Sequence, residues 1–144
     1  MINFFSETDF ELSNTIDVSN WIHKVINGYD KKLGEIVYVF CDDDYLHKLN
    51  MSFLNHNTLT DIITFDNSLG SILHGEIYIS IDRVKENAKD FDTSFLNELY
   101  RVVIHGILHL CGLKDKTEKE EKEMRIAEET ALSLLKNNYT LDNQ

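Results

Sequence analysis

Two histidines four residues apart are the part of this sequence best suited to chemistry. His105 and His109 lie in an otherwise apolar stretch, VVIHGILHLCG, over residues 102–112. If the stretch forms a helix, both imidazoles project from one face, one turn apart. With this spacing, one helix can supply two ligands to a single metal ion. The alternative, two separately hydrogen-bonded core residues, requires a polar partner for each ring, so we favour metal binding.

Asp115 supplies the third donor that a catalytic metal site would need. Gly112 follows His109 closely and is well placed to end the helix in a left-handed turn. The chain can then fold back and bring Asp115 toward the two histidines. Two imidazole nitrogens and one carboxylate oxygen, with the fourth position left to water, describe a catalytic zinc site. The hard oxygen donor would also admit manganese or another divalent ion.

The same spacing resembles the zinc-protease signature His-Glu-x-x-His-x-x-Gly-x-x-His, and one residue separates the two cases. In those enzymes the glutamate after the first histidine is the general base. Here that position is Gly106, which can neither accept nor deliver a proton. We therefore expect little peptide hydrolysis, and no protein residue can be named as the general base.

The elements that position these residues follow from the apolar pattern. Runs rich in β-branched and aromatic residues predict strands over residues 1–5, 35–41, 60–65 and 75–80. Helical spacing predicts helices over 17–28, from 42 onward, over 82–89, over 94–112 and from 117 onward. We expect one α+β domain over residues 1–144, in which helices cover a small mixed β-sheet. The helix at 94–112 is apolar all round and should be its buried centre.

End signals support these helices. Asp17 can cap the first helix, and one residue of 92–94 can cap the long apolar one. Thr117 and Glu120 form a capping-box pattern for the last helix. The acidic residues 42–44 complement the dipole of a helix start, and we prefer this interpretation to an acidic metal site.

Composition narrows the class of protein. Of the 144 residues, 42% are hydrophobic, which is too many for a disordered tail, and no run approaches the roughly 18 apolar residues of a membrane span. The first residues lack the pattern of a secretory signal. Cys41 and Cys111 are expected to be buried thiols, so we expect a cytoplasmic protein without a membrane partner. The formal net charge of −11 should repel nucleic-acid phosphates unless a bound cation or basic patch reverses the field.

The segment HGILHLCG, residues 105–112, resembles the signature of the YbeY family of bacterial metal-dependent endoribonucleases. Its matching pattern is His-Gly-x-Leu-His-Leu-x-Gly. Three weaker segments resemble the same family and occur in its order. They are Leu49-Asn50 with Phe53, residues 60–65 (TDIITF) and residues 75–80 (GEIYIS). The resemblance therefore extends over about residues 49–115.

The resemblance implies a single-strand-specific endoribonuclease that acts in ribosomal RNA maturation and ribosome quality control. It implies one zinc ion per chain at His105, His109 and Asp115, with a metal-bound water at the reaction centre. The implied partners are single-stranded ribosomal RNA and the ribosome or one of its proteins. Two departures stand out: the family's usual third histidine ligand falls on Asp115, and Leu54-Asn55 replaces the arginine after the Leu-Asn segment.

Four residues are candidates for RNA contact. Lys114 and Lys116 flank the third ligand and either hold phosphates or, as we prefer, are solvated lysines at a helix C-terminus. Arg101 lies one turn before the first histidine and either approaches the site or pairs with a carboxylate such as Glu98, which we favour. His56 precedes a predicted strand and is a candidate cleft residue.

Two other functions stay open at this stage. The first is a metal-containing ribosome assembly factor with little or no catalytic activity. The second is a metal-dependent hydrolase of another substrate, most obviously peptide. Normal assembly with a folded His109→Ala variant would favour the first, and peptide turnover that His105→Ala abolishes would favour the second.

Overall fold

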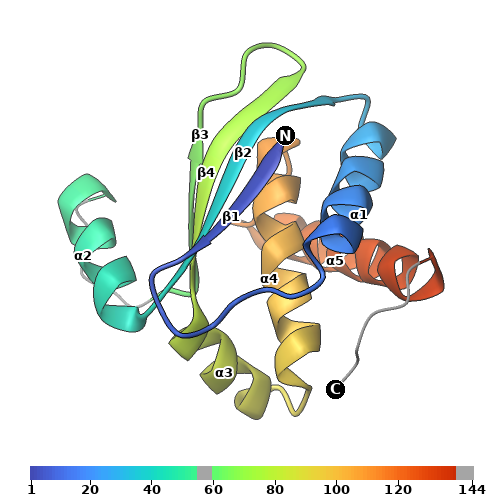
Figure 1. Ribbon diagram of the computed structural model, residues 1–144. Coiled ribbons are helices and arrows are strands. Elements are labelled where there is room, and N and C mark those ends of the chain that lie inside the picture. The colour runs from blue at the N-terminus through green and yellow to red at the C-terminus, as the bar shows by residue number, and fades with distance from the viewer. Residues whose placement is uncertain (55–59, 139–144) are drawn as a thin grey trace.

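A β-sheet with helices on both faces forms the frame of the molecule (Figure 1). The computed structural model describes residues 1–54 and 60–138, which contain four strands and five helices. The strands are β1 (Ile2–Ser6), β2 (Lys32–Cys41), β3 (Ile62–Asp66) and β4 (Ile72–Ser80). The helices are α1 (Thr15–Gly28), α2 (Asp43–Leu54), α3 (Ile81–Asp90), α4 (Phe95–Leu110) and α5 (Glu118–Asn138). The α+β class expected from the sequence is confirmed.

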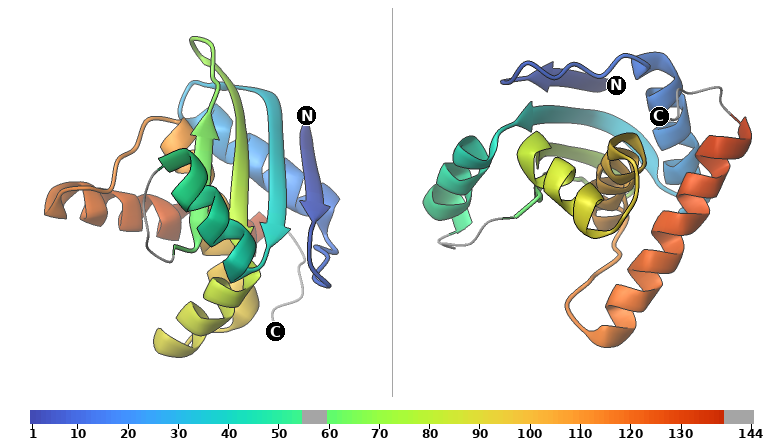
Figure 2. Two further views of the ribbon diagram at one scale, coloured as in Figure 1. Left: turned by 90° about the vertical axis from the view of Figure 1, so that its left-hand side faces the viewer. Right: turned by 90° about the horizontal axis from the view of Figure 1, so that it is seen from below.

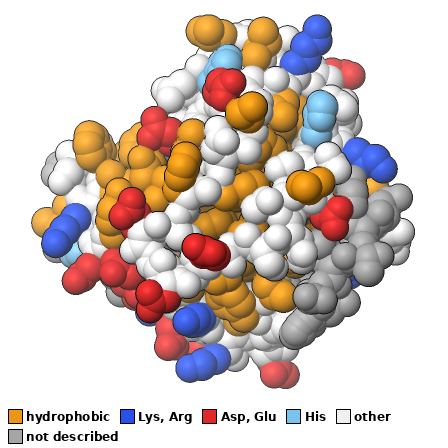
Figure 3. All heavy atoms as spheres, viewed as in Figure 1, with side chains coloured by type: hydrophobic (Ala, Val, Ile, Leu, Met, Phe, Trp, Pro, Cys, Tyr) orange, Lys and Arg blue, Asp and Glu red, His pale blue; other side chains and the backbone are white. Residues whose placement is uncertain are grey.

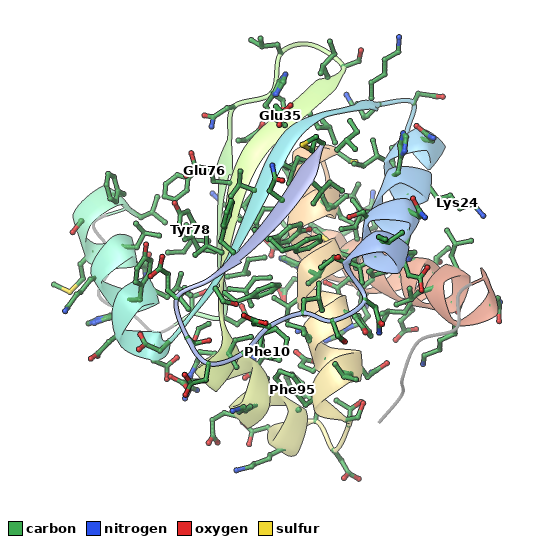
Figure 4. The ribbon with its side chains drawn as sticks, in the orientation of Figure 1. Phe10, Lys24, Glu35, Glu76, Tyr78 and Phe95 are labelled. Atoms are coloured by element: carbon green, nitrogen blue, oxygen red, sulfur yellow. The ribbon has the colours of Figure 1, made fainter. Side chains whose placement is uncertain are left out.

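The sheet is mixed, as expected, and has the strand order β1-β2-β4-β3. β1, β2 and β4 run parallel, and β3 pairs with β4 in the antiparallel direction. Because side chains alternate across a strand, β4 buries Ile77 and Ile79 on the face that α4 covers. Glu76 and Tyr78 project from the opposite face, on the side of α2 (Figure 4). β3 is the edge strand nearest to α2 and α4, and it forms one wall of the candidate site.

The larger hydrophobic core lies between the sheet and helices α1, α4 and α5 (Figure 2, right). The helix predicted to be the buried centre, α4, is buried along most of its length. Two hydrogen bonds fix its surroundings. The buried Tyr38 hydroxyl of β2 donates to the carbonyl of Val103 in α4 at 2.8 Å, and the Trp21 indole of α1 donates to Ala131 of α5 at 2.8 Å. The helix that carries both histidines is therefore tied to the sheet.

A smaller core lies between α2 and the other face of the sheet. Its buried residues are Cys41, Leu46 and Ile63. Figure 3 shows hydrophobic side chains gathered on the surface around this side of the molecule. Exposed hydrophobic residues of the molecule include Phe5 and Phe53, which are 56% and 69% exposed. The sheet face under α2 is thus less completely covered than the face under α4.

Helix ends follow the local side-chain chemistry. Ser94 caps α4, with its hydroxyl accepting from the Asn97 backbone, and the capping box of Thr117 and Glu120 forms with both bonds at 3.1 Å. The prediction for Asp17 is wrong, because α1 begins at Thr15 and places Asp17 in its first turn. There its charge still complements the helix dipole.

The acidic residues 42–44 begin α2, as preferred from the sequence. The Asp42 carboxylate accepts from the backbone of Tyr45 at 2.8 Å, and Asp43 pairs with Arg83 at 3.3 Å. Both cysteines are free thiols, but only Cys41 is fully buried. Cys111, the residue after the end of α4, is partly exposed. Among the described residues, the structure contains no helix that is both long and apolar enough to cross a membrane.

Candidate metal centre

Gly106 allows α4 to lie directly against the sheet. A Cβ atom at this position would lie 3.0 Å from Cδ1 and 3.1 Å from Cγ2 of Ile77, and 3.2 Å from Cδ1 of Ile62. These distances are shorter than ordinary van der Waals contacts, so a larger side chain does not fit unless the side chains of Ile77 and Ile62 shift. The position that carries the general base in zinc proteases therefore faces tightly packed sheet side chains here. This packing is consistent with the absence of a glutamate at this position in the sequence.

The turn after α4 is a Schellman motif, and it returns the chain toward the histidines. The Gly112 amide donates to the carbonyl of His109 at 2.9 Å, and the Leu113 amide donates to Leu108 at 3.0 Å. Gly112 has φ +107°, a conformation that side chains with a Cβ disfavour. The expected left-handed turn at Gly112 is thus present. Beyond it, the segment between α4 and α5 passes outside the β3 edge of the sheet (Figure 2, left).

The turn places Asp115 against both histidines. Its Oδ2 atom lies 3.2 Å from Nε2 of His105 and 3.3 Å from Nε2 of His109. One donor atom from each of the three residues lies within 4.8 Å of the other two. Two ligand atoms bound to a tetrahedral zinc ion at about 2.0–2.1 Å are about 3.3 Å apart. The donor types and their separations therefore fit a zinc ion.

Each histidine is oriented through its other ring nitrogen. Nδ1 of His105 lies 2.6 Å from Oε2 of Glu128 in α5, and Nδ1 of His109 lies 2.9 Å from the carbonyl oxygen of Leu113. A carbonyl oxygen and an ionised carboxylate can only accept hydrogen bonds, so both Nδ1 atoms carry the proton. In a neutral ring, the Nε2 lone pair is then free. Both histidines therefore present Nε2 to the same point, as metal ligands do.

A buried charge network supports His105. Arg101 donates through Nε to Glu98 at 3.0 Å and through an NH group to Glu128 at 3.1 Å, and another NH group lies 3.9 Å from Asp61. Burial alone would raise the pKa of Glu128, but the hydrogen bond from His105 and the charge of Arg101 outweigh it and hold this pKa below its ordinary value. Glu128 is therefore ionised at neutral pH.

The histidines and Asp115 line a cleft of about 760 Å³ between α4, β3 and the end of α2. Other lining residues include Asn50, Leu54, Thr60, Asp61, Thr64, Asp66, Arg101 and Lys116. Asp61 brings a further carboxylate into the cleft. Burial raises the pKa of Asp61 by more than the nearby charges of Arg101 and His105 lower it. Asp61 thus binds a proton more strongly than an ordinary surface aspartate does.

The structure places the residues predicted to contact RNA differently relative to the cleft. Lys116 lines the cleft, whereas Lys114 is exposed and is not among the lining residues. Arg101 both reaches the cleft and pairs with Glu98, so the two interpretations of this residue are compatible. The prediction for His56 falls in residues 55–59, outside the part of the chain that the structure describes.

Sequence reasoning missed Glu128 and Asp61. Glu128 had a detectable signal, because it occupies a core-facing position of α5 between Met124 and Ala131, which are both buried. A lone carboxylate in such a row requires a polar partner. Asp61 had a weaker signal, since its position before β3 does not reveal that Arg101 lies opposite.

Comparison with known proteins connects this geometry to a family. The sequence model of the family described as "Endoribonuclease YbeY" matches residues 3–136. The chain belongs to this family. A relative from Christiangramia forsetii named Endoribonuclease YbeY is 57% identical over 133 residues, which cover 92% of this chain and 93% of the relative. A relative of the same name from Flavobacterium psychrophilum is 53% identical over 134 residues, covering 93% and 96%. The YbeY resemblance of the sequence is confirmed.

A solved structure supports the fold. The solution structure of TM1509 from Thermotoga maritima superposes with a TM-score of 0.65 at 24% identity, and the match covers 100% of this chain and 97% of that chain. At this identity the likeness concerns the arrangement of strands and helices. The YbeY family membership rests on the closer sequence relatives.

Proposed function

We propose that this protein is a metal-dependent endoribonuclease that cuts single-stranded RNA during ribosomal RNA maturation. Its relatives in the family are named as endoribonucleases. The observation that carries the proposal is the convergence of His105 Nε2, His109 Nε2 and Asp115 Oδ2 at one wall of an open cleft. This family role implies three further properties. The substrate is RNA, the protein acts at the ribosome, and its location is the cytoplasm.

The donor set supports zinc as the metal. Two neutral imidazoles and one carboxylate are zinc ligands, and the separations of 3.2 and 3.3 Å match a tetrahedral ion. When bound, the metal would supply Lewis-acid activation of a phosphodiester. Asp115 gives the set one negative charge that a third histidine would lack. The cation therefore remains positive but is weaker in its attraction for phosphate than a three-histidine site.

The remaining cleft residues have distinct roles in this proposal. Lys116 is an exposed cation at the cleft and can contact an RNA phosphate. Arg101 is occupied by Glu98 and Glu128, so its guanidinium organises the site and does not hold phosphate. The raised pKa of Asp61 makes its carboxylate the cleft group outside the metal set that is best suited to hold a proton.

RNA is favoured over peptide as the substrate by the packing at Gly106. Zinc proteases need a carboxylate at this position, and the side chains of Ile62 and Ile77 would crowd even the Cβ atom of such a residue. The proposal therefore predicts cleavage of RNA without turnover of casein.

The first experiment measures metal content and RNA cleavage on the same preparations. The wild-type protein should hold about one zinc ion per chain and cut a single-stranded RNA internally, while a duplex of the same sequence stays intact. Asp115→Ala should lose both properties. Asp115→His, which introduces a third imidazole, should retain zinc.

Asp66→Ala is the matched control, because Asp66 is another cleft carboxylate but is outside the His105, His109 and Asp115 group. This variant should retain zinc. The proposal is wrong if folded, zinc-loaded wild-type protein leaves single-stranded RNA intact. Equal cleavage by wild type and a zinc-free Asp115→Ala variant would instead remove the metal from the mechanism.

A further inference from the structure

A carboxylate of α5 occupies a position where the fold alone would favour an apolar side chain. Met124, Glu128, Ala131 and Leu135 follow one another at helical spacing and are all buried. Three of these residues contribute to the hydrophobic core, and Glu128 is only 2% exposed. Removing a charge from water is costly, and replacing a buried ion pair as a whole with apolar residues often leaves stability unchanged or increases it. Its presence therefore requires an explanation other than packing.

The two oxygens of Glu128 have different partners. Oε1 accepts from Arg101 at 3.1 Å, and Oε2 accepts from Nδ1 of His105 at 2.6 Å. The guanidinium is itself fixed by Glu98, which is 2% exposed and lies one turn earlier on α4. The carboxylate of Glu128 is thus held from one side and can orient the imidazole on the other side.

The two histidines differ in what orients them. His109 uses the neutral carbonyl oxygen of Leu113, which is part of the turn that ends α4. His105 uses an ionised carboxylate from a different helix. A carboxylate on Nδ1 fixes the tautomer, limits ring rotation and makes Nε2 a stronger electron donor to a metal. The charge on Glu128 therefore acts at the metal through His105.

We propose that Glu128 is a positioning residue that fixes His105 with Nε2 directed at the metal and thereby sets the affinity of the site. The proposal rests on the metal-binding function proposed above. Arg101 prevents the carboxylate from turning away, and Glu98 contributes only by holding Arg101. Loss of Glu128 should consequently weaken metal binding, whereas loss of the Glu98 charge should leave it nearly unchanged.

The test compares Glu128→Leu, Glu128→Gln and the matched control Glu98→Gln. Leucine removes the contact while preserving the apolar row of α5, and glutamine retains an acceptor without the charge. Zinc affinity is measured by competition with a chromogenic chelator. Unfolding by urea is followed in the metal-free proteins. We expect at least a tenfold loss of affinity in Glu128→Leu, a smaller loss in Glu128→Gln and less than a twofold change in Glu98→Gln.

A second measurement reports the tautomer of His105 without metal. Nitrogen-15 chemical shifts of the metal-free wild type at pH 8 should show the proton on Nδ1. In Glu128→Leu it should move to Nε2, the usual position in free imidazoles. Folded Glu128→Leu with unchanged zinc affinity or an unchanged tautomer overturns the proposal. An equal loss of affinity in Glu98→Gln also overturns it, because the network would then be structural only.

The tautomer measurement separates this inference from the proposed function. If the wild type binds no zinc, the metal-dependent function fails. The shift of the His105 proton in Glu128→Leu still decides whether Glu128 positions the ring. If Glu128→Leu does not fold, the Glu128→Gln and Glu98→Gln pair decides the question, and equal zinc affinities in those two variants overturn the proposal.

Discussion

Nδ1 of His109 lies 2.9 Å from the carbonyl oxygen of Leu113, so the turn that ends α4 also orients a proposed metal ligand. Gly112 determines this turn, since its φ of +107° allows the Schellman hydrogen bonds to form. Helix termination, His109 orientation and the return of Asp115 are therefore three results of one backbone conformation.

Gly112→Ala should weaken both stability and metal binding. A Cβ atom there meets nothing within 4 Å, so the cost arises from the positive φ alone. We expect a loss of about 1–3 kcal/mol in the free energy of unfolding, with reduced zinc affinity because Leu113 and Asp115 move. Gly70→Ala is the matched control, with φ +60° and open space but outside the site. Urea unfolding and chelator competition test the pair. Equal zinc affinities in the two variants would contradict the role of the turn.

Gly106→Ala should destabilise the protein, although alanine is the better helix former. Alanine would gain about 1 kcal/mol in helix propensity. The added methyl would meet Ile77 at 3.0 and 3.1 Å, and this isoleucine is 0% exposed and would have to shift by a few tenths of an ångström. Overpacking of a core typically costs about 1–3 kcal/mol, so we expect a net loss of about 1 kcal/mol. Thermal and urea unfolding measure it. A more stable variant would show that α4 and the sheet can separate at little cost.

Asp61 should make stability depend on pH in a specific direction. Its pKa is raised by burial, so between its unfolded and folded pKa values the folded protein binds more protons than the unfolded chain. The stabilising contribution is complete below the unfolded pKa of about 3.9 and is lost as pH rises through the folded pKa. In the Asp61→Asn variant, the asparagine side chain does not ionise, so this pH-dependent contribution is absent. From pH 4 to 7, metal-free wild type should therefore lose stability relative to Asp61→Asn in urea unfolding. A constant difference across this range would exclude the effect.

Replacement of Lys114 and Lys116 by glutamine should weaken RNA binding without removing zinc. Lys116 lines the cleft and Lys114 does not, so Lys116→Gln should account for most of the loss. Each phosphate contact removed should reduce the slope of log affinity against log salt by about 0.7 for a single strand. Fluorescence anisotropy with labelled single-stranded RNA at several salt concentrations measures this slope. An unchanged slope in the double variant would mean that both lysines are simply solvated.

Local patterns predicted most of the fold and the proximity of the three proposed ligands. The i, i+4 histidines, the glycine at the end of the helix and the following aspartate are close in sequence, so helix geometry alone relates them. The capping box of Thr117 and Glu120 was predictable for the same reason. The start of α1 was not, because Asn14 and Asp17 are both common N-cap residues, and the structure has Asn14 at the N-cap.

The network around His105 was not predictable from these patterns. His105 and Glu128 are 23 residues apart on different helices, and their contact depends on how α5 crosses α4. Asp61 and Arg101 likewise meet only because β3 lies beside α4. A charged residue in an apolar row signals that a partner exists, but the fold identifies the partner.

The contact between α4 and α5 also has a consequence for how the protein is made. Synthesis proceeds from the N-terminus, so His105, His109 and Asp115 exist before Glu128 has been added. A nascent chain that ends between them holds every proposed ligand but lacks the carboxylate that orients the first one. If Glu128 orients His105 as proposed, the site becomes ready for its metal only when the last helix has docked, and an incomplete chain would bind that metal more weakly.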